Sequence, residues 1–136
     1  MSSKNNILYL DTSELIARIA LFDSSLRGAG SDAAILAEEP WEAGRELSST
    51  LSKKFEEILS KVGLEPKDLG GICVFVGPGS FTGLRIGLSF ANGLAFALGI
   101  PVYETREKGI LNLSESKKTA LPFYGAEPKI TKPKSK

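Results

Sequence analysis

The stretch at residues 77–93 constrains the fold of this 136-residue chain more than any other part. An apolar run at 71–76 precedes it and a helical pattern follows it, which predicts a strand, a glycine-rich turn and the start of a helix. Gly77 and Gly79 supply the backbone freedom that a tight turn requires, and Pro78 fixes φ between them. Such a turn either holds an anion or aims the helix, and the sequence leaves both uses open.

Composition excludes several kinds of chemistry. Apolar residues make up 42% of the chain and charged residues 24%, the balance of an ordinary soluble domain, and the net charge of +1 gives no overall attraction for nucleic acid. The chain has no histidine, which excludes Ser–His and Cys–His nucleophile pairs and metal sites held by imidazole. The one cysteine, Cys73, lies in the apolar run and is expected to be buried. We expect no cofactor, no metal and no catalytic residue.

The order of apolar patterns predicts an α/β fold. Strands are expected at 7–10, 14–23, 34–38, 71–76 and 100–103, with helices at 47–62 and 81–98. Gly63 and Gly99 stand where the two helices should end, and Ser80 or Thr82 is expected to cap the second helix. The predicted lobe is a five-stranded mixed sheet in the order β-β-β-α-β-α-β with flanking helices. Because no N-terminal signal segment or membrane-spanning stretch is expected, we predict a cytoplasmic location without membrane contact.

The second expected helix is apolar on nearly all sides, so both of its flanks should be covered. Small residues recur along it at four-residue spacing: Gly83, Gly87, Ala91, Ala95 and Gly99. This file of small residues either packs onto the chain's own sheet or forms a groove for a partner helix, and we favour the partner. Arg85 is expected to make a structural or interface ion pair or to contact a phosphate. Opposite the apolar stripe of the first helix lie Ser49, Thr50 and Lys53, which either are simply solvated or join the same surface, and we include them in the expected partner surface.

Asp11 ends the first expected strand, where actin-like ATPases and ribonuclease H-like nucleases keep a carboxylate that directs a metal ion. It either caps the following turn or remains from a ligand site that also used Gly77, Gly79 and Ser80. The 77–83 turn matches a phosphate loop poorly, because Leu and Arg follow Gly83 where Lys and Ser or Thr are required. An actin-like nucleotide-binding enzyme that uses Asp11 and this turn is therefore the alternative hypothesis for function.

The chain resembles the TsaB family, also called YeaZ. The resemblance runs through about residues 6–105, and its most specific part is the run from Gly77 to Gly87. The matching segments are 7–13, 47–62, 68–72, 77–93 and 99–101. The resemblance implies the N-terminal lobe of the actin-like, ribonuclease H-like superfamily, which agrees with the predicted strand order.

The resemblance also implies a function. TsaB proteins are non-catalytic subunits of the bacterial machinery that makes threonylcarbamoyladenosine at position 37 of tRNA. They pair with the catalytic paralogue TsaD through the two helices of this lobe, and the ATPase TsaE joins them. TsaD holds its metal through histidines, so a chain without histidine suits the partner rather than the catalyst. Without TsaD, two copies are expected to form a homodimer through the same surface. A stand-alone homodimer with a different binding role is a third hypothesis.

The resemblance implies a second lobe in family members, of which we expect this chain to have almost none. The expected organisation is therefore an actin-like lobe at 1–106, followed by a short remnant and a basic, flexible tail at 107–136. The apolar spot at 121–124 is expected to dock back onto the sheet.

Overall fold

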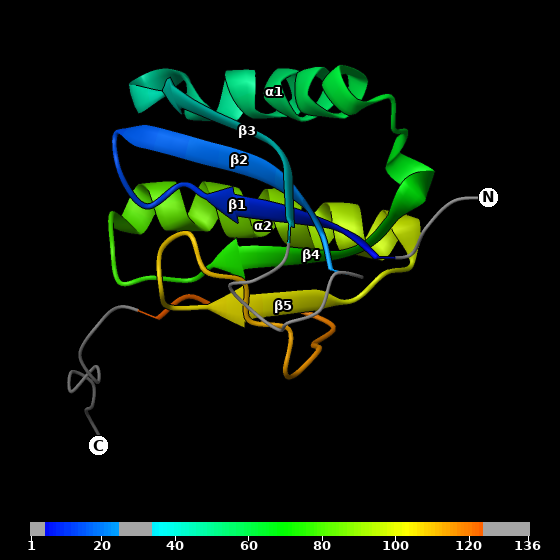
Figure 1. Ribbon diagram of the computed structural model, residues 1–136. Coiled ribbons are helices and arrows are strands. Elements are labelled where there is room, and N and C mark those ends of the chain that lie inside the picture. The colour runs from blue at the N-terminus through cyan, green and yellow to red at the C-terminus, as the bar shows by residue number, and fades with distance from the viewer. Residues whose placement is uncertain (1–4, 25–33, 124–136) are drawn as a thin grey trace.

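The structure is built on one mixed five-stranded sheet with its strands in the order β3-β2-β1-β4-β5 (Figure 1). The computed structural model describes residues 5–24 and 34–123. The strands are β1 (Asn6–Asp11), β2 (Ile16–Asp23), β3 (Ala34–Glu42), β4 (Leu69–Phe75) and β5 (Val102–Thr105), and the helices are α1 (Leu47–Val62) and α2 (Phe81–Leu98). Two short 3-10 turns, η2 (Gly44–Glu46) and η3 (Pro66–Asp68), precede α1 and β4. The expected turn at 24–33, apart from Ser24, and the expected roles of Tyr124 and the basic tail lie outside the described residues.

The direction of the strands follows from their connections. β1, β2 and β3 form an antiparallel meander, while β4 runs parallel to β1 and β5 runs parallel to β4. Long helical connections precede β4 and β5, as parallel neighbours require, and α2 alone joins β4 to β5. The predicted five-stranded mixed sheet and its order of elements are thereby confirmed.

β3 is longer than predicted, because it continues through Pro40 to Glu42. Among the described strands, β3 pairs only with β2 and forms one edge of the sheet. A proline is tolerated on an edge strand, since its missing N–H group needs no ladder partner on the open side. Trp41, beyond the proline, packs toward α1 and donates a hydrogen bond of 3.0 Å from Nε1 to the hydroxyl of Thr50.

Both helices cover the same face of the sheet. The apolar stripe predicted for α1 is buried there, and the helix ends at Gly63, whose φ of 73° is the left-handed conformation of a helix C-cap. Figure 1 shows α2 behind the sheet along β1 and β4, with α1 beside β2 and β3. Side chains of both helices and of four strands form the main core, which includes Leu8, Ile19, Leu51, Ile58, Ile72, Val74, Leu84 and Leu88.

The second face of the sheet has a smaller core. Ile7, Tyr9, Phe22 and Cys73 pack there with Leu111, which belongs to the segment after β5. In Figure 1 this segment, coloured gold to orange, passes in front of the strands on the side away from α2. Cys73 is buried as expected, and this burial raises the pKa of its thiol to about 11. A loop therefore provides the cover on this face.

By length and composition α2 could cross a membrane, with a mean hydropathy of 1.3, although no such stretch is expected from the sequence. The fold explains the apolar composition of α2 without a membrane. α2 joins two paired strands of one sheet and packs along that sheet, so it is a core helix of an α/β unit. Only 28% of the residues of α2 are buried, however, so much of its outer side is open.

Candidate functional site

The glycine-rich turn before α2 is fastened to the end of β1. Ser80 donates its backbone N–H to the carbonyl oxygen of Ser13 at 2.9 Å. The hydroxyl of Ser80 accepts the N–H of Gly83 at 3.3 Å, which is the predicted N-cap. Gly77 has a φ of 117°, and a Cβ there would collide with the carbonyl oxygen of Phe123. The chain's own atoms fill the turn, and these contacts support its use in aiming a helix.

The file of small residues on α2 faces the sheet. A Cβ at Gly83 would collide with the carbonyl oxygen of Thr12, and a Cβ at Gly87 with the Thr12 hydroxyl. Ala91 and Ala95 are buried in the main core farther along the helix. The prediction that this groove is open to a partner is therefore wrong for Gly87, Ala91 and Ala95, and Gly83 is half-buried. Packing on the chain's own sheet, the alternative left open by the sequence, is what the structure has.

The opposite side of α2 is exposed and carries two exposed phenylalanines. Phe96 has 88% of its surface exposed and Phe81 has 53%. The other exposed positions of the helix are Thr82, Arg85, Ser89, Gly93 and Ala97. The guanidinium group of Arg85 lies over the ring of Phe81, 5.1 Å from its centroid. Arg85 thus lies on the outward side, as an interface residue must.

The exposed side of α2 continues onto α1. The rings of Phe55 and Phe90 make an edge contact at 5.7 Å between centroids, so the two helices lie side by side. Ser49 and Lys53 are exposed on α1. Thr50 is directed toward β3, because its hydroxyl accepts the indole N–H of Trp41 and donates to the carbonyl oxygen of Glu46 at 2.9 Å. The expectation that Thr50 faces a partner is therefore not supported. We call the exposed sides of α1 and α2 the helix platform.

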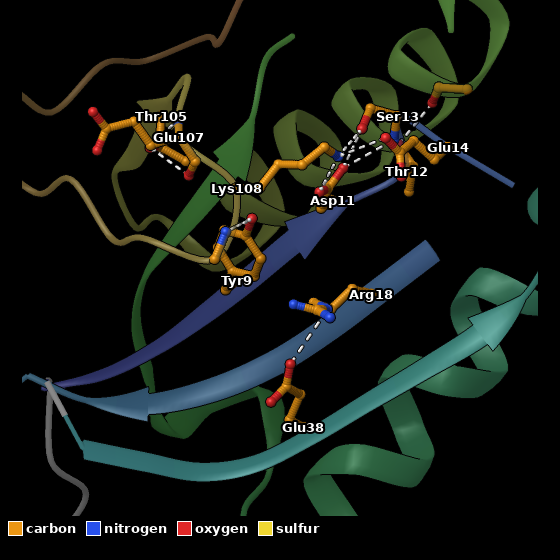
Figure 2. Close-up of polar contacts among 12 residues, drawn as sticks. Tyr9, Asp11, Thr12, Ser13, Glu14, Arg18, Glu38, Thr105, Glu107 and Lys108 are labelled. Atoms are coloured by element: carbon orange, nitrogen blue, oxygen red, sulfur yellow. Dashed lines mark hydrogen bonds and ion pairs between the residues drawn. The ribbon is translucent and has the colours of Figure 1, made fainter. Parts of the chain in front are cut away.

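A polar cluster lies at the carboxyl end of β1 (Figure 2). Asp11 is only 6% exposed, and its Oδ1 atom accepts the backbone N–H and the hydroxyl of Ser13 at 2.9 and 2.7 Å. Its Oδ2 atom lies 2.8 Å from Nζ of Lys108, and the ammonium group also donates to the Ser13 hydroxyl at 2.6 Å. Glu14 lies 3.7 Å from the same ammonium group. Asp11 therefore caps the turn after β1 and is neutralised by a lysine of its own chain.

The residues proposed as remnants of a phosphate site are brought together, but other contacts already use them. Asp11 faces Lys108, Gly79 packs on Ser13, and the N–H and hydroxyl groups of Ser80 are engaged as described above. Among residues 5–24 and 34–123, no group of three or more His, Cys, Asp or Glu side chains could hold a metal ion.

Sequence reasoning missed Lys108. The residue is 97 positions from Asp11 and lies in a charged segment that resembles a solvated loop. No spacing rule connects two such residues, because a turn after β5 creates their proximity. Tyr9 gives a second contact to this turn: its hydroxyl accepts the N–H of Gly109 at 2.7 Å. Burial, the largest effect, raises the pKa of Tyr9 well above its ordinary range.

Comparisons with known proteins match TsaB (YeaZ) proteins and also proteins described as tRNA N6-adenosine threonylcarbamoyltransferases. The profile of the family described as "TsaD: tRNA N6-adenosine threonylcarbamoyltransferase" matches residues 37–117. TsaB of Haemophilus influenzae, described as a tRNA threonylcarbamoyladenosine biosynthesis protein, is 32% identical over 121 residues, 89% of this chain and 45% of that protein. A tRNA N6-adenosine threonylcarbamoyltransferase of Thermus thermophilus is 43% identical over 61 residues, 45% of this chain and 19% of that protein. The chain thus spans less than half of the length of these relatives.

Solved structures add the fold. YeaZ from Pseudomonas aeruginosa superposes with a TM-score of 0.63 and 30% sequence identity over 77% of this chain and 44% of that one. RuvC from Thermus thermophilus, in complex with a Holliday junction substrate, superposes with a TM-score of 0.50 and 14% identity over 74% of this chain and 63% of that one. The second similarity shows the fold alone, and it agrees with the ribonuclease H-like lobe predicted from the sequence.

Proposed function

Because the chain belongs to the TsaB (YeaZ) family, we propose that it is a non-catalytic scaffold that binds and activates the catalytic paralogue TsaD. The pair would act in the synthesis of threonylcarbamoyladenosine at position 37 of tRNA. TsaE would join as the ATPase, and tRNA would be bound through the complex. The names of the TsaB relatives and the match to the TsaD family profile support the pathway.

The observation that carries the proposal is the outer side of α2. A helix that faces water on one side normally carries polar residues there. On α2, Phe81 and Phe96 are 53% and 88% exposed, and Gly93 and Ala97 are exposed too, beside the polar Thr82, Arg85 and Ser89. Contiguous exposed apolar surface marks interaction sites on globular proteins. We therefore assign this side of α2 to the partner.

The proposed contact set differs from the one expected at first. Arg85, Ser89, Gly93 and Phe96 of α2 would face TsaD, together with Ser49 and Lys53 of α1. The small residues on the inner side of α2 would not contact TsaD. They would instead set how closely α2 packs on the sheet, and they are Gly83, Gly87, Ala91 and Ala95. Two adjacent exposed helices suit a partner that presents two helices of its own, as a paralogue with the same lobe would.

The polar groups suit a scaffold better than a catalyst. The sequence has no histidine to supply the metal ligands that the family resemblance assigns to TsaD. Asp11, the carboxylate best placed to direct a metal ion, is paired with Lys108. We therefore assign no catalytic residue to this chain.

Co-expression with the TsaD of the same organism tests the proposal, with the products separated by size-exclusion chromatography. We expect both chains to elute as a single complex. Two separate peaks would contradict the proposal, whether this chain elutes as a monomer or as a homodimer. A homodimer that forms only without TsaD would agree with shared use of the helix platform.

The nucleotide-binding alternative has its own test. Titration calorimetry of the isolated chain with ATP and Mg²⁺ should give no saturable heat, because a lysine faces the Asp11 carboxylate and the turn is filled. Saturable binding in the micromolar range would support an actin-like enzyme that uses Asp11 and the 77–83 turn.

A further inference from the structure

The edge of the sheet where β1, β4 and β5 end is the place where an open α/β sheet usually takes a ligand, because parallel strands leave a crevice outside their carboxyl ends. In this chain the side chain of Lys108 lies at this edge of the sheet. Lys108 reaches back from the turn after β5, and its ammonium group lies beside Asp11 and Ser13 at the end of β1 (Figure 2). The ammonium group also lies 4.5 Å from the centroid of the Phe75 ring at the end of β4. One cation thus links the ends of two strands with the turn after the third.

The segment that carries Lys108 has few apolar contacts of its own. Between 106 and 113 only Leu111 is buried, while Ile110 and Leu113 are half-buried. Leu111 packs with Ile7, Tyr9 and Cys73 on the second face of the sheet. Segments with few buried apolar contacts open locally at low free-energy cost. The position of this segment must therefore depend strongly on its polar contacts.

Polar contacts hold the segment at several residues. The Arg106 guanidinium group lies 3.9 Å from the centroid of the Phe123 ring, and the backbone of Asn112 bonds to Cys73. Lys108 bonds to Asp11 and Ser13, and the N–H of Gly109 bonds to the Tyr9 hydroxyl at 2.7 Å. Of these, the bonds of Lys108 are charge-assisted, and the Asp11 carboxylate that receives one is almost fully buried. Charge-assisted hydrogen bonds are about twice as strong as neutral ones.

We propose that Lys108 is a latch that holds the 106–113 segment closed over the second face of the sheet. When the latch is released, the segment lifts and exposes Tyr9 and Cys73 while the two helices stay packed on the other face. The 106–113 segment and Lys108 both belong to this lobe, so the inference does not depend on the identity of any partner.

The single cysteine offers a direct test, since Cys73 lies under the segment and any thiol modification reports on that one site. The rate of modification by a disulfide reagent is measured under native conditions for the wild type and for Lys108→Met. The substitution keeps most of the side-chain length and removes the charge. We expect the rate to rise by about tenfold or more, the change expected for loss of a charge-assisted hydrogen bond. Lys118→Met, at an exposed lysine nearby, is the matched control and should stay within about twofold of the wild type.

The dependence on urea separates local from global opening. In Lys108→Met the faster modification should hardly change at low urea, because lifting a short segment exposes little surface. Asp11→Asn should give a similar increase, and the double variant should add little to either single one. Equal rates in Lys108→Met and the wild type would overturn the proposal. So would an increase with the full urea dependence of global unfolding.

Discussion

Thr12 occupies the groove that Gly83 and Gly87 leave on α2. Its hydroxyl donates a hydrogen bond of 2.7 Å to the carbonyl oxygen of Gly83, and a Cβ at Gly87 would collide with that hydroxyl. The end of β1 and the first turns of α2 can approach closely because both helix positions lack a side chain. The glycines therefore fix which side of α2 meets the sheet, and by doing so they fix which side faces outward.

This contact predicts that Gly87→Ala destabilises the fold, although alanine is the better helix former. The added methyl group must displace Thr12, and overpacking of a tight site costs about 1–3 kcal/mol. Urea denaturation followed by circular dichroism measures the free energy of unfolding.

Gly93→Ala is the matched control on the same helix. No atom lies within 4 Å of a Cβ placed at Gly93, so the substitution should stabilise the protein by about 0.5–1 kcal/mol. Equal effects at Gly87 and Gly93 would contradict the assignment of the buried side of α2.

Asn92 predicts a second stability effect, because it fastens the segment before Phe123 to α2. Its side-chain amide donates to the carbonyl oxygen of Ala120 at 3.0 Å and accepts the N–H of Ala120 at 2.8 Å. Asn92→Ala leaves two backbone groups of Ala120, a buried residue, without these partners and should cost about 1–3 kcal/mol. Ser89→Ala, at an exposed position one turn earlier on α2, is the control and should change the free energy of unfolding by less than about 0.5 kcal/mol. A loss at Asn92 no larger than that at Ser89 would show that this segment is not fastened as described.

Alkaline pH should weaken the fold through the second face of the sheet. Burial raises the pKa of the Cys73 thiol from its ordinary 9.0 to about 11, so the native state keeps this proton after the unfolded chain has lost it. The unfolded state then binds fewer protons than the native state, and the free energy of unfolding falls as the pH rises from about 9 to about 11. Two pKa units correspond to roughly 2–3 kcal/mol. Denaturation in urea at several pH values measures the decline.

The Cys73→Ala variant isolates the thiol. Its free energy of unfolding should fall less steeply over the same pH range, and the slope that remains should come mainly from Tyr9, whose pKa burial also raises. Identical slopes with and without the thiol would contradict this account.

The sequence predicted the elements well because each has its own local signal. The apolar stripe of α1 and the glycine at its end placed that helix, and the branched residues of β4 marked a strand buried on both faces. The orientation of α2 was not predictable in the same way. When nearly every position is apolar or small, the helical pattern does not indicate which side meets the sheet. Contacts at Thr12 decide it, and they depend on tertiary structure.

Lys108 shows that local sequence patterns could not predict the whole polar cluster either. Asp11 was recognisable as the end of a strand followed by turn-forming residues, and it does bond to Ser13 as a capping carboxylate would. Its cationic partner comes from beyond β5, so only the assembled sheet brings the two charges together. Local patterns predict strands and caps, while pairs between distant charged residues require the fold.

The central claim is that the outer side of α2 binds TsaD, and an equilibrium binding measurement with purified TsaD tests it most directly. Phe96→Glu changes the most exposed large apolar residue of the helix platform, and Ile35→Glu makes the same change at a residue of β3 that is 56% exposed. Neither side chain is part of the core, so both variants should fold. We predict that Phe96→Glu weakens binding by about 30-fold or more, as loss of an interface hot spot does, while Ile35→Glu stays within about twofold of the wild type. Wild-type affinity in Phe96→Glu, or an equal loss in both variants, would contradict the account.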